Sequence, residues 1–221
     1  MKRVLYSGNR NASSWAFRAW LALKEQAIDF DEVMVDIRRP QRWDNLARIG
    51  EFSPPAAVPV LDDDGFIIFD SMAIMEYANE IGNGSLLPSD AKQRAKARSF
   101  AAWQHSTFGR VCSCLFFESA FYKEKRALTQ DEIATLNKVY DIWQHTIASF
   151  SGDYLIGDFS LADIMLLPSV IRFNAHYPPD GRWPLVQKWF EQLQSRPFVV
   201  EWMDEAHSLE PIYLPGYHND P

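Results

Sequence analysis

The chain has 221 residues, a length that predicts one large domain or two modest ones. A composition with 47% hydrophobic and 23% charged residues excludes an intrinsically disordered chain, and a net charge of -7 gives no electrostatic basis for non-specific binding to nucleic acid. No apolar run is long enough to span a bilayer, and the N-terminus enters a strand-like segment instead of a signal-peptide core, so we expect a cytoplasmic protein with no nucleic-acid or membrane partner.

The first 82 residues alternate between strand-like and helix-like patterns. Short apolar runs predict strands at 4–7, 30–35, 58–61 and 66–69, and the last two flank an acidic turn that ends in Gly65. Apolar residues at helical spacing predict helices that begin at Ser13 or Ser14, at Gln41 and at Ser71, which is expected to cap the third. The resulting order, βαβαββα, favours parallel strands joined by a right-handed crossover.

Helical patterns replace strand patterns after residue 88. The predicted helices span 89–119, 129–150, 160–172 and 183–194, and a last one begins at 197. Because the segment 82–88 separates the two kinds of pattern, we place a domain boundary there, between residues 1–82 and an all-helical domain of residues 89–221. The expected fold class is therefore α/β plus all-α.

The two cysteines, Cys112 and Cys114, both fall in a predicted helix. Side chains two residues apart on a helix point to nearly opposite faces, so we expect no disulfide between them and interpret both as small buried apolar residues. No cluster of His and Cys has metal-ligand spacing, and we expect no metal. Arg38, Arg39 and Arg42 lie close together before a helix and are interpreted as solvated surface.

Four segments carry motifs: NRNASSW at 9–15 followed by Arg18, PAAVPVL at 55–61, DSMAI at 70–74 and GDFSLAD at 157–163. In this order they resemble the serine-bearing loop, the cis-proline strand, the acidic-Ser-x-Ala-Ile motif and the C-terminal capping box of the cytosolic glutathione-transferase superfamily, nearest to its zeta-like and related bacterial branches. The resemblance implies a thioredoxin-like first domain that binds glutathione and a helical domain that contributes the pocket for an electrophile.

Activation of glutathione requires a negatively charged sulfur. Its thiol has a pKa of roughly 8.5 in solution, so the protein must stabilise the thiolate. A hydroxyl that donates to the sulfur would contribute about 1.5 to 3 kcal/mol, and the amides at a helix N-terminus act in the same sense. Ser13 and Ser14 stand at such a helix start, and we favour Ser13 as the donor and Ser14 as the helix cap; a capping role alone is the alternative. Asn11 occupies a position where a zeta-like sequence has a hydroxyl and can donate through its amide, so the choice among the three stays open.

The peptide part of glutathione is expected at two further places. A cis Val58–Pro59 bond would leave the backbone around Ala57, Val58 and Pro59 able to pair with an extended peptide, whereas a trans proline at a strand edge is the structural alternative. Asp70 can accept from an ammonium, and Ser71 can present its N–H and hydroxyl to a carboxylate at a helix N-terminus. The γ-glutamyl group carries both charges, although a simple helix cap would explain the same two residues.

Two remaining features belong to the helical domain. Ser160 and Asp163 have the spacing of a capping box, which we interpret as structural. Aromatic residues at helical spacing are mostly core residues, but some can line a substrate pocket; the candidates are Trp103, Phe108, Phe116, Phe117, Phe121 and Tyr122.

Taken together, these residues predict an enzyme that brings the glutathione thiolate to a small electrophile, by conjugation or by thiol-assisted isomerisation. A glutathione-dependent thiol oxidoreductase would need a cysteine at the first helix start, which the first domain lacks. A transferase-like binding or regulatory protein without catalysis is the alternative from another class. The resemblance also implies a homodimer.

Overall fold

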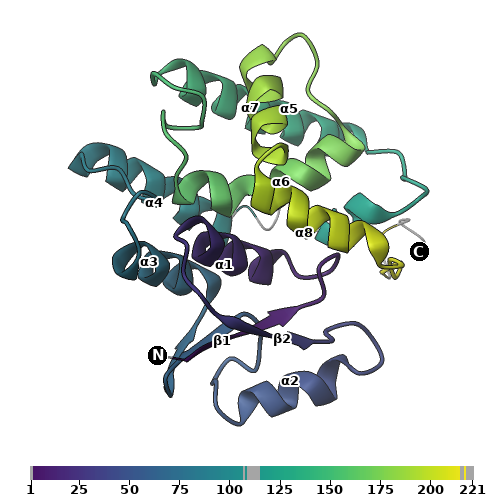
Figure 1. The fold of residues 1–221 in the computed structure, drawn as a ribbon. Coiled ribbons are helices and arrows are strands. Elements are labelled where there is room, and N and C mark those ends of the chain that lie inside the picture. The colour runs from purple at the N-terminus through teal and green to yellow at the C-terminus, as the bar shows by residue number, and fades with distance from the viewer. Residues whose placement is uncertain (1, 107, 109–114, 215–216, 218–221) are drawn as a thin grey trace.

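The computed structural model describes residues 2–106, 108, 115–214 and 217, and its elements follow the predicted order βαβαββα and then helices (Figure 1). The first part contains β1 (Arg3–Gly8), α1 (Ser14–Glu25), β2 (Asp31–Val35), α2 (Arg42–Gly50), β3 (Val60–Asp63), β4 (Phe66–Phe69) and α3 (Ser71–Ile81). The second part contains α4 (Ala91–Ser106), the short 3-10 helix η2 (Phe117–Phe121), α5 (Gln130–Ala148), α6 (Leu161–His176), α7 (Pro184–Gln194) and α8 (Pro197–Ser208).

The four strands form one mixed sheet in the order β2-β1-β3-β4. β1 runs parallel to β2 and antiparallel to β3, and β3 and β4 form the predicted hairpin. Helices α1 and α3 lie over one face of the sheet and α2 lies over the other (Figure 1). Because β1 and β2 are parallel, the loops that follow Gly8 and Val35 leave the sheet at the same edge, and the loop after Gly8 leads directly into α1.

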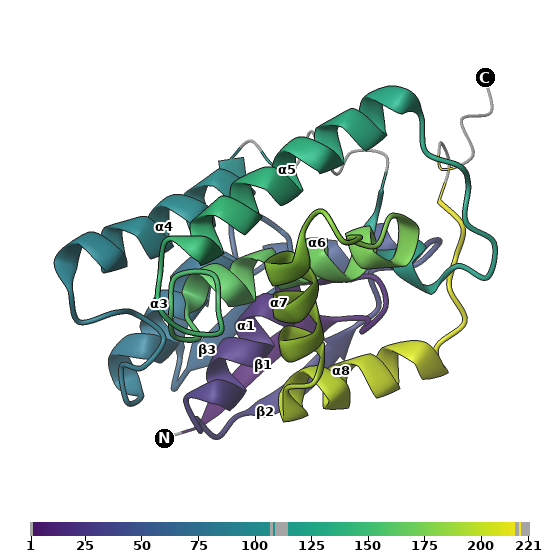
Figure 2. The same ribbon diagram turned by 90° about the horizontal axis from the view of Figure 1, so that it is seen from above.

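Helix α6 is the centre of the second part. Every residue from Leu161 to Phe173 in this helix is buried, as expected of a helix with neighbours on all sides. It packs against α1 of the first part as well as α4 and α7, and Figure 2 shows it between α1 and α5. The largest cluster of buried apolar side chains accordingly runs from Leu5 in the sheet through α1 and α6 to Trp202 in α8.

Two predictions about helix boundaries are wrong. The single helix expected over 89–119 is not continuous, because α4 ends at Ser106 and Phe116 has an extended backbone before η2. The carbonyl of Leu115 accepts from Arg172 of α6 at 3.2 Å, a tertiary contact that takes the place of a helical hydrogen bond. The predicted roles of Cys112 and Cys114 lie outside the described residues.

The second correction concerns the cap of α3. Asp70, and not Ser71, is the N-cap, because its side chain accepts from the amide of Met72 at 2.8 Å while Ser71 is the first helical residue. Aspartate is as favourable a cap as serine, so the sequence pattern alone does not separate the two.

The capping box at the start of α6 is confirmed, and it is fully enclosed. One oxygen of Asp163 accepts from the amide and the hydroxyl of Ser160, both at 2.9 Å, and the other accepts from the amide of Leu155 and the indole of Trp189, at 3.1 and 2.8 Å. Asp163 has no exposed surface, so burial raises the pKa of its carboxyl while the four donors act against that rise. The box therefore joins three segments of the helical part.

In the described part of the chain, no helix has the length and apolar character needed to cross a bilayer.

Replacing Asp163 with alanine should lower the free energy of unfolding by at least about 3 kcal/mol, since three buried N–H donors would each lose their acceptor. Chemical denaturation monitored by tryptophan fluorescence measures this loss. Asp158 is an exposed carboxylate in the same loop, and the matched variant Asp158→Ala should stay within about 0.5 kcal/mol of the parent. Equal losses in the two variants would contradict a structural role for the box.

Candidate active site

A cavity of about 700 Å³ opens at the sheet edge where the loops after β1 and β2 emerge. The first part of the chain contributes the start of α1, the loop and first turn of α2, and the backbone before β3. The second part contributes η2, α6 and the segment after α8. The lining residues are Ala12, Ser13, Ser14, Trp15, Ile37, Arg38, Arg39, Arg42, Trp43, Leu46, Ala57, Val58, Phe116, Phe117, Glu118, Arg172, Ile212, Tyr213 and Leu214.

Ser13 and Ser14 both border this cavity but differ in their local role. Ser13 is the N-cap of α1: it is 4% exposed and its hydroxyl accepts from the amide of Ala16 at 3.2 Å. The prediction that Ser14 caps the helix is therefore wrong, because Ser14 is the first helical residue. Within the described residues, neither the hydroxyl of Ser14 nor the amides of Ser14 and Trp15 have a hydrogen-bond partner.

Arg18 fixes the N-terminus of α1 against the helical part of the chain. Its Nη1 donates to the carbonyl of Ser14 at 3.0 Å and its Nε donates to the carbonyl of Met165 in α6 at 2.7 Å. The guanidinium also lies 4.3 Å from the centre of the Trp15 ring. The first turn of α1 is thus fixed to the helical part by a charged side chain that is only 1% exposed.

The Val58–Pro59 bond is cis, as the family resemblance implied. Ala57 and Val58 border the cavity, and the strand ladder of β3 begins only at Val60. The predicted strand 58–61 therefore starts two residues too early, and the backbone of Val58 lies outside the described ladder, beside the cavity.

Asp70 lies in a neighbouring groove between α3 and α4, with a volume of about 510 Å³. One of its oxygens caps α3, and the other lies 2.8 Å from Nε2 of His105. The His105 ring in turn contacts the Trp15 ring, with 5.5 Å between centres, so a short chain of contacts connects the groove to the main cavity. The hydroxyl of Ser71 is buried and has no partner among the described residues.

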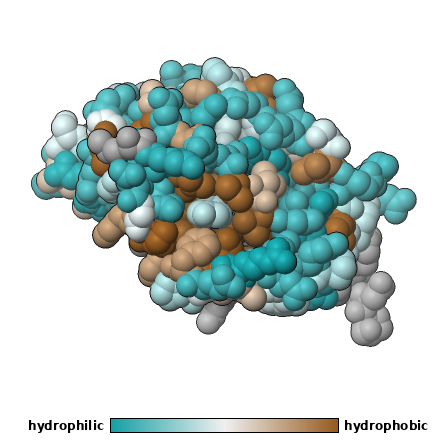
Figure 3. All heavy atoms as spheres, turned by 60° about the horizontal axis from the view of Figure 1, so that its bottom comes forward, coloured by the Kyte–Doolittle hydropathy of each residue, from teal (hydrophilic) through white to brown (hydrophobic). Residues whose placement is uncertain are grey.

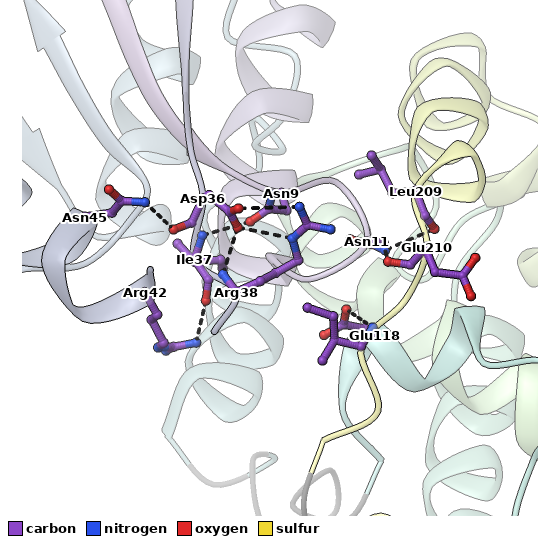
Figure 4. A network of polar contacts seen from close by, with 11 residues as sticks. Asn9, Asn11, Asp36, Ile37, Arg38, Arg42, Asn45, Glu118, Leu209 and Glu210 are labelled. Carbon is purple, nitrogen blue, oxygen red and sulfur yellow. Dashed lines mark hydrogen bonds and ion pairs between the residues drawn. The ribbon is translucent and has the colours of Figure 1, made fainter. Parts of the chain in front are cut away.

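Asn11 points away from the cavity. Its side-chain amide donates to the carbonyls of Leu209 and Glu210, at 3.4 and 3.5 Å, and the residue is fully buried (Figure 4). Asn11 therefore joins the loop before α1 to the segment after α8, whose next residues Ile212 and Tyr213 form part of the cavity wall.

The three arginines interpreted as solvated surface all border the cavity; Arg39 is exposed, as that interpretation expects, whereas Arg38 and Arg42 are half-buried. Arg38 is held by Asp36, with Nε 3.1 Å from Oδ1, and Arg42 donates to the carbonyl of Ile37 at 3.3 Å (Figure 4). Burial alone would raise the pKa of Asp36, but the hydrogen bonds from Arg38 outweigh it and lower the pKa. The sequence signal was present as three arginines directly after a strand at the functional edge of the sheet.

The aromatic candidates separate into wall and core. Phe116 and Phe117 border the cavity, whereas Phe108 is fully buried and meets the Trp103 ring edge to face, with 4.6 Å between ring centres. Tyr122 holds the C-terminal segment: its hydroxyl donates to the carbonyl of Ile212 and accepts from the amide of Leu214. Burial raises the pKa of Tyr122 to about 12, so this hydroxyl stays protonated at neutral pH.

Glu118 is a cavity residue that the sequence reading missed. It belongs to η2, is 4% exposed, and accepts from the amide of Ile212 at 2.9 Å. Burial raises the pKa of its carboxyl, and the bond from Ile212 opposes that rise only in part. The available signal was a single acid within the aromatic stretch that follows α4.

Among the described residues, no three side chains of His, Cys, Asp or Glu are grouped so that they could hold a metal ion.

A four-stranded sheet with a cis proline next to a helix start, joined to a helical half, defines a thioredoxin-like fold with an added helical domain. Residues 12–81 match the family model "Glutathione S-transferase, N-terminal domain", and residues 92–197 match "Glutathione S-transferase, C-terminal domain". The chain belongs to the glutathione S-transferase family, and it is an enzyme of glutathione-dependent transfer or isomerisation.

Similar proteins agree with this assignment. Maleylacetoacetate isomerase of Mus musculus is 31% identical over 80% of this chain and 82% of its own length. An epsilon-class glutathione S-transferase of Musca domestica has the same fold, with a TM-score of 0.76, 24% identity and 94% of each chain covered. A glutathione transferase homologue of Burkholderia, solved with bound glutathione, has a TM-score of 0.68 and 25% identity, covering 95% of this chain and all of its own. Nothing in these comparisons favours the non-catalytic alternative.

The two serines should differ in their effect on stability. Ser13→Ala removes the cap of α1 and should lower the free energy of unfolding by about 1 kcal/mol, whereas Ser14→Ala should change it by less than about 0.5 kcal/mol. Urea denaturation of both variants alongside the parent measures the difference. A larger loss for Ser14→Ala than for Ser13→Ala would show that the cap has been assigned to the wrong serine.

Proposed function

We propose that this protein activates glutathione at the N-terminus of α1 and presents the thiolate to a small electrophile in the adjoining cavity. The observation that carries the proposal is the unpartnered hydroxyl of Ser14, together with the unpartnered amides of Ser14 and Trp15, at the wall of that cavity. Donors at a helix N-terminus favour an anion through both their hydrogen bonds and the helix dipole.

Ser14 is the proposed donor to the sulfur. Ser13 is nearly enclosed and its oxygen already accepts from Ala16, whereas Ser14 is only half-buried. Asn11 contributes indirectly, since its amide is engaged with the C-terminal segment. This choice departs from the preference for Ser13 expressed above, for the physical reason that a hydroxyl must reach the ligand before it can stabilise it.

The peptide part of glutathione is proposed to run from Val58 to the start of α3. The backbone around Ala57, Val58 and Pro59 borders the cavity outside the sheet ladder, which supports pairing with the cysteinyl backbone of the ligand. The carboxylate of Asp70 would take the γ-glutamyl ammonium in place of its present contact with His105. The N-terminal amide of Ser71 would then meet the γ-glutamyl carboxylate, and its hydroxyl, which is enclosed in this structure, would join it only after a change of rotamer.

The second substrate is proposed to carry a conjugated double bond or another electrophilic carbon. The relative named maleylacetoacetate isomerase supports the isomerisation branch, in which the thiolate adds to the double bond and leaves again. Phe116, Phe117 and Tyr213 supply apolar wall, and Arg172 supplies positive charge on the helical side of the cavity.

The assembly and location are part of the same proposal. We infer a homodimer in the cytoplasm, with residues 1–82 and 89–221 as the two domains. Large apolar side chains are exposed in the first part, including Phe52 at 38% and Phe69 at 40%, and Figure 3 shows apolar side chains gathered on one face of the molecule. An exposed apolar area of this kind supports a protein interface. Sedimentation equilibrium at micromolar concentration tests the dimer.

Alanine at Ser14 should lower kcat for conjugation of chlorodinitrobenzene about 10- to 100-fold, because a hydrogen bond to a charged sulfur is worth roughly 1.5 to 3 kcal/mol. The pKa of bound glutathione, read from the ultraviolet absorbance of the thiolate, should rise by about one to two units in the same variant. Ser13→Ala and Asn11→Ala are the comparison variants, and both should keep most of the activity. Full turnover in all three would rule out activation by this loop.

Asparagine and alanine at Asp70 should separate its two roles. Asp70→Asn keeps a good cap and the fold, but it loses the charge, so KM for glutathione should rise about tenfold or more while thermal stability stays near that of the parent. Asp70→Ala should show the same rise in KM and also lose about 1 kcal/mol of stability. An unchanged KM in Asp70→Asn would argue against an ammonium at this carboxylate.

A further inference from the structure

Glu118 is a carboxylate that borders the cavity. The glutathione binding and thiol activation proposed above do not use it. It stands on η2, which belongs to the helical part, whereas Ser14 and Val58 belong to the first part. One of its oxygens accepts from the amide of Ile212 at 2.9 Å (Figure 4). The other oxygen has no hydrogen-bond partner among the described residues, and it is not among the polar atoms enclosed without one, so it faces the cavity.

The surroundings of Glu118 favour its protonated form. Burial is the largest influence on the pKa of this carboxyl and raises it. Arg38 on the loop after β2 acts in the opposite sense, and Asp36 on the same loop adds to the rise. Arg172 of α6 borders the same cavity, and the charge of Glu118 adds to the burial that raises the pKa of Tyr122, whose hydroxyl stays protonated at neutral pH.

Anchoring the C-terminal segment does not by itself require an acid at this position. The bond from the amide of Ile212 needs only an acceptor, which a glutamine would supply, and Tyr122 already holds Ile212 and Leu214 through two hydrogen bonds. A buried carboxyl that has only one such bond is costly compared with an amide. The feature that only the acid supplies is a proton that can be given and taken back.

We propose that Glu118 is a catalytic general acid for electrophiles whose double bond is conjugated to a carbonyl group. Its cavity-facing oxygen lies on the helical wall, while the sulfur is held at the start of α1 on the first-domain wall, so a substrate between them meets both groups. The inference rests on the proposed placement of the thiolate.

The proposed isomerisation consumes no net proton. As the sulfur–carbon bond forms at the carbon β to the carbonyl, the π electrons of the carbon–carbon double bond form a new double bond between the α carbon and the carbonyl carbon. The π electrons of the carbonyl move to its oxygen, which takes the proton of Glu118 and gives an enol. Rotation then occurs about the carbon–carbon bond that has become single. Return of the proton from the enol to the Glu118 carboxylate re-forms the double bond in the other configuration and breaks the sulfur–carbon bond, which restores the thiolate. No further reactant is needed.

Glu118→Gln tests this assignment because it keeps the acceptor for Ile212 and removes the proton donor. Two probes are compared: maleylacetone, a cis-configured conjugated ketone whose isomerisation needs a proton, and chlorodinitrobenzene, whose substitution by thiolate releases chloride and needs none. We expect kcat for maleylacetone to fall about 100-fold or more and kcat for chlorodinitrobenzene to stay within about threefold. Glu124→Gln, an exposed glutamate just beyond η2, is the matched control and should leave both rates unchanged.

The pH profile supplies a second readout that a structural role would not move. The isomerisation rate should depend on two ionisations in the parent and follow thiolate formation alone in Glu118→Gln, and Glu118→Asp should recover part of the rate. A parallel fall of both reactions, or no fall in either, overturns the assignment. A parent enzyme that turns over only chlorodinitrobenzene also overturns it, whereas a parent inactive on both probes with no bound thiolate signal would instead refute the proposed function.

Discussion

The guanidinium of Arg18 is enclosed between α1 and α6, where a buried charge needs hydrogen bonds to offset its loss of water. Its partners are the carbonyls of Ser14 and Met165, which lie in different halves of the molecule. The geometry of the first turn of α1 is therefore determined together with the position of α6. A small rotation of the helical part would break one of these bonds and displace the turn where the anion is expected.

The contact between α1 and α6 also determines where the other residues of the cavity lie. The fully buried Asp163 fixes the start of α6, Arg18 fixes α1 against it, and Arg172 near the other end of α6 takes the carbonyl of Leu115. That contact directs the chain into η2 and brings Glu118 to the cavity. One helix thus positions both walls of the site, so the capping box at its start supports the cavity from a distance.

Local chemistry made much of this architecture predictable. The period of apolar residues predicted the strands and helices, and the S-x-x-D spacing predicted the box at Ser160, whereas only the family resemblance implied the cis bond before Pro59. The features that the sequence did not predict depend on tertiary contacts. Whether Ser13 or Ser14 caps α1 depends on the residue at which the backbone becomes helical, and Glu118 lies in a segment whose predicted helix is replaced by a contact with Arg172. The arginines after β2 resemble any solvated cluster until the loop is placed at the sheet edge.

The segment after α8 has a consequence for how the enzyme is made. Asn11 near the beginning of the chain bonds the carbonyl of Leu209, a partner 198 positions later, and Ile212 to Leu214 complete the cavity wall. During synthesis the sheet and α1 emerge from the ribosome long before this wall exists. A nascent chain that lacks residues 209–214 would therefore expose an open cleft, and substrate binding would have to wait until these residues are translated.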